Sequence, residues 1–451
     1  MNVIIVGCGR VGQTLAEKLN SDGNEVTVID MSADKVKETT EMADVMGVVG
    51  NGATHTTLRE AGIKTADLFI AVTNSDELNL LCCMIAKKEG DCKTIARLKS
   101  PEYSEETEYL RTELGLAMVI NPEYAAAEEI ARVLRFPTAI KIEPFAKGKV
   151  EIIQFKIPEG SVLIGSSIKE LMMKYPSEVL VCTIERGEQA YIAKGDFVFQ
   201  EKDVVSIVAS PKNANEFFRK IRRKDPSVHS AMIIGGGVIT HYLCEILAKS
   251  GVALKIIERD ENICAELAET FPKCSVICGN PTDKELLAEE GVAGAGAFLT
   301  LTNSDEENIL LSLFAKEVFG GKLVTKIKRT DYDNVIKRLE LDTVICPKNI
   351  TSDTIVRYVR STKNTSGSNI ETMYNIIEDK VEASEFIIKA GSEIIGKPIS
   401  ELRFKPDVLV ACITRGDKVI IPRGSDVIEA GDAVVVVTKM LGLHDIVDVL
   451  R

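Results

Sequence analysis

The sequence contains no tryptophan, only four histidines, and no apolar stretch long enough to cross a bilayer. A membrane-spanning helix needs about 20 consecutive apolar residues, whereas the apolar runs here, such as residues 433–437, are short. The chain opens on a predicted strand, residues 2–6, with no basic stretch before it, so we expect no signal peptide. Any association with a membrane is therefore expected to run through a partner protein.

Clustered metal ligands are also missing. The eleven cysteines lie scattered through apolar segments, no CxxC pair occurs, and the histidines are far apart in sequence. A zinc site needs such residues close together, so we expect no metal. The cysteines are expected to be small buried side chains in a reducing cytoplasm.

Basic residues are fewer than acidic residues, which gives a formal net charge of −12. A nucleic-acid partner would require a basic face against its phosphates, and an anionic lipid surface would require basic clusters. The composition therefore argues against direct binding to either one.

The chain does contain an internal duplication. Residues 3–9 correspond to residues 231–237, and residues 73–77 correspond to residues 302–306, at a separation of 228 or 229 residues. A near-constant offset over such a distance indicates that one whole unit was copied. The junction is predicted near residues 224–227, a charged segment that contains a proline.

Each copy begins with short apolar strands that alternate with amphipathic segments such as residues 78–88. Strands separated by helices of this length favour right-handed βαβ units and a parallel sheet. In the first copy the predicted strands are residues 2–6, 25–29, 45–49, 67–72, 93–98 and 117–120.

The remainder of each copy has a different pattern, with turn signals between strands and one short helix at residues 167–173. The predicted strands there are residues 151–158, 179–185, 190–193 and 204–209, and residues 382–439 repeat the pattern. The fold class is therefore α/β, with two Rossmann-like doubly wound parallel-sheet domains, each followed by a small α+β regulatory module. The predicted boundaries are 1–138, 139–224, 228–362 and 366–451.

A glycine loop, G-x-G-x-x-G at residues 7–12, follows the first strand and opens the first helix. In that context the glycines permit a tight turn, close approach of a pyrophosphate and close helix–strand packing. The helix N-terminus then offers free N–H groups to the phosphates. Asp30 ends the second strand, where a carboxylate can accept both ribose hydroxyls and repel a 2′-phosphate, which favours NAD(H) or another adenosine ligand over NADP(H). A tight turn that binds nothing is the alternative.

The second copy carries residues 235–240 in place of that loop, and Glu258 takes the acid position. Thr240 replaces the third glycine, which predicts looser helix–strand packing or a displaced pyrophosphate. An empty second site and a site for a different ligand both remain open.

Topology brings in the loop after the fourth strand. In the strand order 3-2-1-4-5-6 the crevice lies between strands 1 and 4, so residues 73–76 and 302–305 should face the ligand. Ser and Asp there are equally typical of a helix N-cap. Arg97, which ends the fifth strand, is placed to reach a terminal phosphate or to be an ordinary surface cation, as is its counterpart Lys326.

Together, residues 7–12, Asp30, residues 50–52 and residues 73–77 resemble the regulator-of-potassium-conductance nucleotide-binding domain. Two such domains in one chain, each trailed by a small module, resemble the TrkA family of peripheral subunits of Trk potassium uptake systems. The candidate cofactor-binding residues are Gly7, Cys8, Gly9, Arg10, Val11, Gly12, Asp30, Asn51, Thr73, Asn74, Arg97, Gly235, Gly236, Gly237, Val238, Ile239, Glu258, Thr302 and Asn303.

The resemblance implies binding of NAD(H) or ATP/ADP, assembly into a homo-oligomeric ring, and docking on the cytoplasmic face of a membrane potassium-translocating subunit. The expected function is thus a regulatory subunit with no catalytic residues. Two alternatives stand beside it: an NAD-dependent oxidoreductase, for which His55 lies near the crevice, and a nucleotide-binding scaffold unrelated to ion transport.

Overall fold

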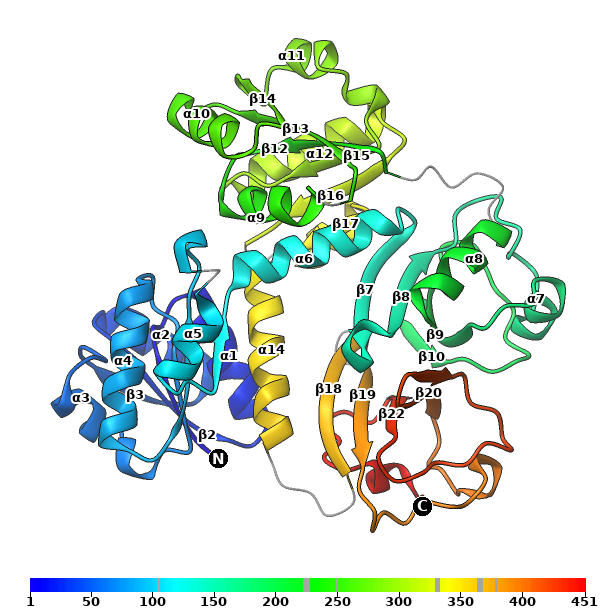
Figure 1. Cartoon of the computed structure of the whole chain (residues 1–451), viewed down its shortest axis with the longest axis horizontal. Coiled ribbons are helices and arrows are strands. Elements are labelled where there is room, and N and C mark those ends of the chain that lie inside the picture. The colour runs from blue at the N-terminus through cyan, green and yellow to red at the C-terminus, as the bar shows by residue number, and fades with distance from the viewer. Residues whose placement is uncertain (104–105, 222–227, 249, 329–332, 363–367, 378–379) are drawn as a thin grey trace. The chain divides into compact units, whose positions relative to one another are not determined.

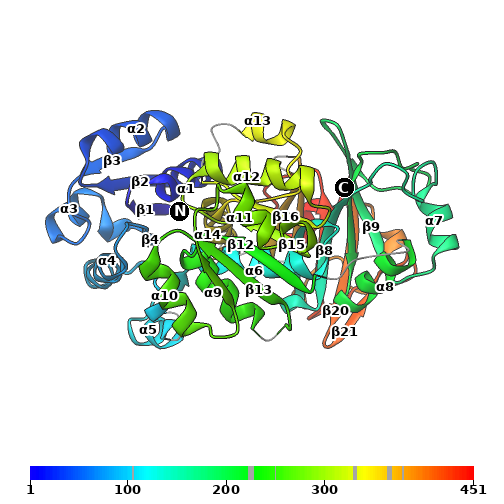
Figure 2. The ribbon, with the colours of Figure 1, turned by 90° about the horizontal axis from the view of Figure 1, so that it is seen from above.

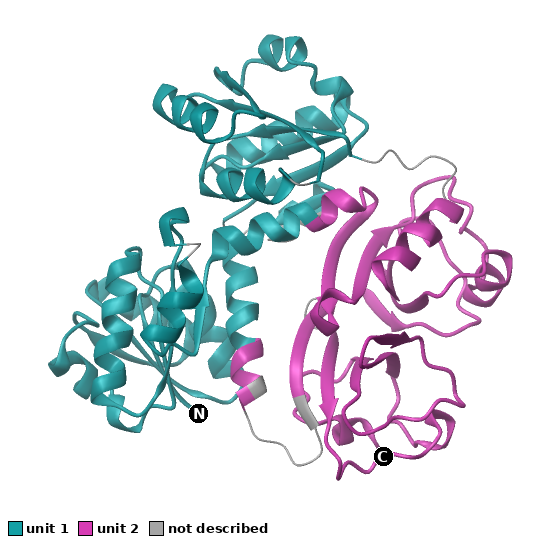
Figure 3. Cartoon of the chain, viewed as in Figure 1, with its two compact units in different colours: residues 1–131, 228–356 teal, residues 132–227, 357–451 magenta. Residues whose placement is uncertain are grey.

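The computed structural model describes residues 1–103, 106–221, 228–248, 250–328, 333–362, 368–377 and 380–451 (Figure 1). The predicted junction at residues 224–227 lies outside them. The chain divides into two compact units, residues 1–131 with 228–356 and residues 132–227 with 357–451 (Figure 3). Within these described stretches, no helix combines the length and apolar character needed to cross a membrane.

The first half of the first unit is an alternating α/β domain. Its strands and helices are β1 (Asn2–Val6), α1 (Arg10–Ser21), β2 (Glu25–Asp30), α2 (Ala33–Ala43), β3 (Met46–Val49), α3 (His55–Glu60), β4 (Leu68–Ala71), α4 (Asp76–Glu89), β5 (Lys93–Arg97), α5 (Thr107–Glu113), β6 (Met118–Ile120) and α6 (Pro122–Arg135).

The six strands form one parallel sheet in the order β3-β2-β1-β4-β5-β6, as predicted. Helix α2 covers one face, and α3 and α4 cover the other (Figure 2). Strands β1 and β4 are almost wholly buried, because both of their faces pack under helices. This order places the ends of β1 and β4 at the switch point of the sheet, where such folds bind ligands.

The second half of the unit repeats this domain. Its elements are β12 (Ser230–Ile234), α9 (Val238–Leu247), β13 (Ala253–Glu258), α10 (Glu261–Thr270), β14 (Ser275–Cys278), α11 (Lys284–Glu289), β15 (Ala297–Thr300), α12 (Asp305–Val318), β16 (Lys322–Lys326), α13 (Asp333–Arg338), β17 (Thr343–Ile345) and α14 (Pro347–Thr362). The sheet order β14-β13-β12-β15-β16-β17 matches that of the first domain.

The second unit holds two antiparallel sheets of five strands each. The first has the order β10-β9-β11-β8-β7, and its elements are β7 (Ala139–Phe145), β8 (Val150–Lys156), α7 (Ile168–Lys174), β9 (Leu180–Arg186), β10 (Gln189–Ile192), β11 (Val204–Ala209) and α8 (Pro211–Ile221). The second has the order β18-β19-β22-β20-β21, from β18 (Ser368–Ile377), β19 (Val381–Ile388), β20 (Val408–Arg415), β21 (Lys418–Ile420) and β22 (Ala433–Thr438).

One apolar core joins these two sheets. Val150 and Cys182 of the first sheet and Val381 and Val437 of the second belong to the same buried cluster. A small module buries a smaller fraction of its surface on folding than a larger domain does. The shared cluster therefore adds apolar burial to both modules.

Strand β7 is absent from the sequence prediction. Lys141, Glu143 and Pro144 interrupt its apolar pattern, yet the strand pairs with β8 along its length. It lies at the edge of the sheet, where proline is tolerated because no further strand needs its missing N–H. Which strand lies at the edge of a sheet depends on tertiary pairing, so the apolar periodicity of the sequence does not predict it.

A buried ion pair connects α14 to β19. Arg360 Nη1 lies 3.0 Å from Glu382 Oε1, and both side chains are nearly inaccessible to solvent. Glu382 Oε2 also accepts the N–H of Gly442 at 2.9 Å.

Removal of the arginine tests this pair. The substitution Arg360→Met leaves a buried carboxylate without its counter-ion, which should lower the free energy of unfolding by about 3–5 kcal/mol. Addition of Glu382→Gln removes the stranded charge while keeping an acceptor for Gly442, and should restore much of the loss. Urea unfolding followed by circular dichroism measures both, and equal stability of wild type and Arg360→Met would contradict the assignment.

Candidate functional site

The site begins where β1 turns into α1. Gly7 has φ +105°, a conformation that L side chains rarely adopt. A Cβ atom there would also lie 3.1 Å from the backbone of Val72 and Thr73, so the end of β4 approaches the loop closely. A Cβ on Gly12 would lie 1.8 Å from the carbonyl oxygen of Gly7. Two of the three glycines are thus required by the protein's own packing.

Gly9 is different, because nothing lies within 4 Å of where its Cβ would be. It is the N-cap of α1, with ordinary φ −78° and no side-chain capping hydrogen bond. The same is true of Gly237 at the start of α9. The first-turn N–H groups of a helix have no carbonyl partner within the helix. Both domains therefore present bare amides and the positive end of a helix dipole to open space.

A carboxylate supports each loop. Asp30 Oδ2 accepts the N–H of Cys8 at 2.8 Å, and its Oδ1 accepts the N–H of Ser32 at 2.9 Å. In the second domain Glu258 Oε2 accepts the N–H of Gly236 at 2.6 Å. A carboxylate has about four acceptor positions, so each acid keeps capacity for a further donor such as a ribose hydroxyl.

Thr240, which takes the place of the third glycine, contacts the loop directly. Its side chain is fully buried and its hydroxyl donates to the carbonyl oxygen of Gly235 at 2.6 Å. In the first domain, a Cβ on the corresponding Gly12 would collide with the carbonyl oxygen of Gly7. In the second domain a side-chain hydrogen bond therefore joins the loop to its helix, a contact that Gly12 cannot make in the first domain.

The loop after β4 is locked by a residue outside the predicted set. Asn79 Oδ1 accepts both the N–H and the hydroxyl of Thr73, at 2.8 and 2.7 Å. Its Nδ2 donates to the carbonyl oxygens of Thr73 and Arg97, at 3.2 and 2.9 Å. The N-cap alternative also holds, because Ser75 Oγ accepts the N–H of Leu78 at 3.2 Å. The Thr73 hydroxyl thus serves the loop itself.

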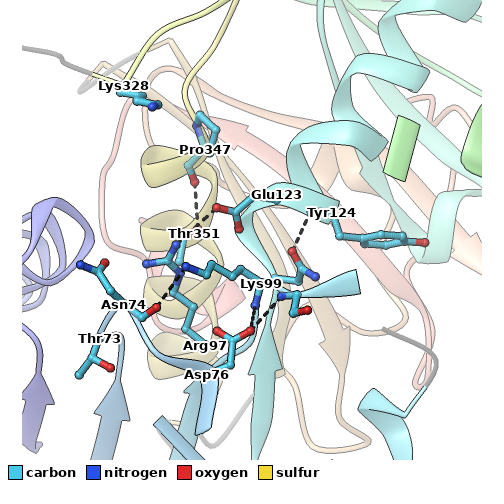
Figure 4. A network of polar contacts seen from close by, with 12 residues as sticks. Thr73, Asn74, Asp76, Arg97, Lys99, Glu123, Tyr124, Lys328, Pro347 and Thr351 are labelled. Carbon is cyan, nitrogen blue, oxygen red and sulfur yellow. Dashed lines mark hydrogen bonds and ion pairs between the residues drawn. The ribbon is translucent and has the colours of Figure 1, made fainter. Parts of the chain in front are cut away.

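Asp76 belongs to the predicted loop, but its partners were not predicted. Its buried carboxylate accepts the N–H groups of Lys99 and Ser100, both at 2.9 Å, and Lys99 Nζ donates to Asn74 O at 3.1 Å (Figure 4). The second domain repeats the Asn79 arrangement through Asn308 and the Lys99 contact through Lys328. Asn79 and Asn308, like Lys99 and Lys328, are 229 residues apart. This repetition at the offset of the duplication was the sequence signal that could have identified these residues.

Arg97 and Lys326 occupy equivalent strand ends but are held differently. The Arg97 guanidinium lies 3.4 Å from Glu123 Oε1 and its side chain is largely buried (Figure 4). Lys326 is buried and its Nζ donates to the carbonyl oxygen of Leu301 at 2.7 Å. Burial lowers the pKa of Lys326 to about 8. An anion would therefore have to compete with an internal partner for either cation.

The remaining predicted residues have smaller roles in this geometry. The Cys8 side chain is buried, and desolvation raises the pKa of its thiol to about 11. Arg10 is exposed on the first turn of α1. Asn51 Oδ1 accepts the N–H of Ala53 at 2.9 Å. A Cβ on Gly52 would lie 2.3 Å from Val6, so the Asn51 loop does border the end of β1.

Two parallel-sheet domains, each with a bare helix N-terminus and a supporting acid, define a protein with a duplicated dinucleotide-binding fold. The TrkA-N domain family matches residues 3–122 and 231–347, and the TrkA-C domain family matches residues 152–222 and 383–450. The chain belongs to the TrkA family.

Full-length relatives agree with this assignment. The chain is 33% identical over 444 residues to "Trk system potassium uptake protein TrkA homolog 1" of Methanosarcina mazei, covering 97% of each chain. It is 31% identical to the TrkA homolog of Archaeoglobus fulgidus over 100% of both chains. It is 30% identical to TrkA of Haemophilus influenzae over 97% of this chain and 95% of the relative.

Solved structures share the fold. The structure called "GsuK channel bound to NAD" superposes with a TM-score of 0.63 at 18% identity, covering 97% of this chain and 76% of that one. The GsuK RCK domain alone superposes with a TM-score of 0.64 at 17% identity, covering 97% and 92%. The predicted fold class is thereby confirmed.

The depressed pKa of Lys326 gives a stability prediction. An unfolded lysine has a pKa near 10.5, so between pH 8 and 10.5 the unfolded chain binds more protons at this residue than the folded chain. Stability linked to Lys326 therefore rises with pH through that window, since the cost of burying its charge is present in full only below pH 8.

We expect the Lys326→Met variant to lose this gain. From pH 7 to pH 10, the wild type should become more stable relative to Lys326→Met by up to about 3 kcal/mol. Urea unfolding of both proteins at each pH measures the difference. A constant difference across the window would mean that Lys326 has an ordinary pKa in the folded protein.

Proposed function

We propose that this chain is a regulatory subunit that binds NAD(H) or an adenine nucleotide and thereby gates a membrane potassium uptake protein. Its relatives bear the name of Trk potassium uptake proteins. One structure of the same fold is that of the GsuK channel bound to NAD, and another is that of GsuK bound to ADP.

The observation that carries the proposal is the space in front of Gly9 and Gly237. No packing within the described structure requires a glycine at either position, because a Cβ would meet nothing within 4 Å. Both glycines nevertheless lie at uncapped helix N-termini. A phosphate group resting on those amides would explain the absence of a side chain, because a Cβ would occupy the place of the phosphate.

The chain's own residues divide the work of binding. The amides of Gly9, Arg10 and Val11 would hold the pyrophosphate, and Asp30 would accept the ribose hydroxyls. A 2′-phosphate would meet the Asp30 carboxylate, so the site should prefer NAD(H) to NADP(H). In the second domain Gly237, Val238, Ile239 and Glu258 would have the same roles, with Thr240 altering the position of the loop.

Gating requires a ligand that binds one conformation better than another. A nucleotide with a terminal phosphate would compete with Glu123 for Arg97, whereas a ligand without one would leave that pair intact. A tenfold preference corresponds to about 1.4 kcal/mol per site, so several coupled sites in a homo-oligomeric ring would strengthen the response. The ring would dock on the cytoplasmic face of its potassium-translocating partner.

We further propose that the chain is not an enzyme. A dehydrogenase needs an acid or base beside the nicotinamide. His55, the histidine predicted nearest the crevice, has Nδ1 2.7 Å from Glu89 Oε2 and Nε2 3.4 Å from Arg59 Nη1. Both ring nitrogens therefore have partners within the protein, one on α3 and one at the end of α4. An assay of NADH oxidation with a panel of oxo acids should show no turnover.

A glycine series tests the site. The Gly9→Ala variant should melt close to the temperature of wild type, since its Cβ enters open space, but it should bind NADH and ATP at least about tenfold more weakly. Gly237→Ala probes the second site in the same way. Isothermal titration calorimetry measures affinity, and a ligand-free thermal melt measures stability.

Two further glycine variants serve as controls for this series. The Gly12→Ala variant should lose stability even without ligand, because its Cβ would clash with Gly7 O. The Gly294→Ala variant, also in open space but before β15 at the opposite end of the sheet, should change neither quantity. Unchanged affinity in both Gly9→Ala and Gly237→Ala would refute the proposed binding mode.

The gating role is tested separately with Asp30→Asn, which retains an acceptor for Cys8 but removes the charge. In cells whose potassium uptake depends on this chain, the variant should change the response of uptake to the nucleotide pool. Potassium influx measured with rubidium as tracer provides the readout. If the variant binds nucleotide more weakly yet uptake is unaltered, the nucleotide does not gate the transporter.

A further inference from the structure

Two cysteines of the second parallel-sheet domain lie beside the same residue. Cys278 ends β14, and its Cα is the register partner of Glu258 in β13. Cys264 lies in the first half of α10, which packs against β14, and its Sγ donates to the carbonyl oxygen of Glu258 at 3.3 Å. The Cys278 thiol is one of the groups that raise the pKa of the Cys264 thiol, so the two side chains lie close together. A close pair of free thiols therefore lies between the helix and the end of the strand.

The two thiols differ in their access to solvent. Cys278 is exposed, whereas Cys264 is only 8% exposed. Desolvation raises the pKa of the Cys264 thiol to about 12. Because the thiolate is the reactive form and access is required, Cys278 is the thiol that a reagent reaches first.

The first domain shows that the fold does not need this pair. At the positions that correspond by the 228- and 229-residue offsets it carries Val36 and Val49. Val36 is buried on α2, and Val49 is exposed at the end of β3. Valine therefore satisfies the packing, and the thiols of the second domain add a chemistry that the packing does not require.

We propose that Cys264 and Cys278 form a dithiol site that low-molecular-weight disulfides oxidise reversibly, joining α10 to the end of β14. The Cys278 thiolate attacks one sulfur of the small disulfide, whose S–S bond breaks and releases one small thiolate. Cys264 then loses its proton, and its sulfur attacks the mixed disulfide at Cys278, releasing the second small thiol. The two protein thiols are oxidised, and one small disulfide is reduced to two thiols.

Tryptic cleavage suits a direct test, because residues 260–273 contain Cys264 as their only cysteine, and residues 274–284 contain Cys274 and Cys278. The full-length Cys274→Ser variant removes the ambiguity in the second peptide. The reduced protein is incubated with glutathione disulfide, remaining thiols are alkylated, and the digest is read by mass spectrometry without reduction. We expect the two peptides to be joined, and dithiothreitol to separate them.

Single variants separate the two steps. Cys264→Ser should accumulate one glutathione on Cys278, because the second attack is impossible, whereas Cys278→Ser should leave Cys264 unmodified over the same time. Fragment ions of the joined peptides from wild type locate the bond without any substitution. Glutathione that remains on Cys278 when Cys264 is present, or peptides that stay unlinked and unmodified, would overturn the proposal.

Discussion

In both parallel-sheet domains, a carboxylate at the end of the second strand accepts the backbone N–H that follows the first glycine of the loop. Asp30 holds Cys8 in this way, and Glu258 holds Gly236. This hydrogen bond fixes the loop between strand and helix, so that the first amides of the helix stand clear of the sheet. The open space before Gly9 and Gly237 depends on it, as does the proposed place of the pyrophosphate.

The duplication produced two domains with the same frame and different details. The shared frame includes Asn79 and Asn308, whose side chains hydrogen-bond the loop after the fourth strand to the end of the fifth. The details include Thr240, whose hydroxyl donates to the carbonyl oxygen of Gly235, and Lys326, which is buried and donates to the carbonyl oxygen of Leu301. If both proposed sites bind nucleotide, such differences would give them unequal ligand preferences.

Much of the fold followed from the sequence, because buried parallel strands and amphipathic helices have distinct apolar periods. The glycine loop, Asp30 and the strand order were predictable for the same reason: each depends on local pattern or on a rule of βαβ topology. Strand β7 was missed, since its place at a sheet edge lets it carry Lys141, Glu143 and Pro144. The Asp76 contacts to Lys99 and Ser100 were missed, because they join residues more than 20 positions apart through backbone groups that carry no residue signature.

We propose above that the free amides at the start of α1 hold a pyrophosphate. A crystal structure of the protein grown with NADH tests it most directly. We expect phosphate oxygens within about 3 Å of the amide nitrogens of Gly9 to Val11, with the adenosine ribose beside Asp30. Dinucleotide density that lies elsewhere on the protein, or a crevice without density at saturating NADH, would contradict it.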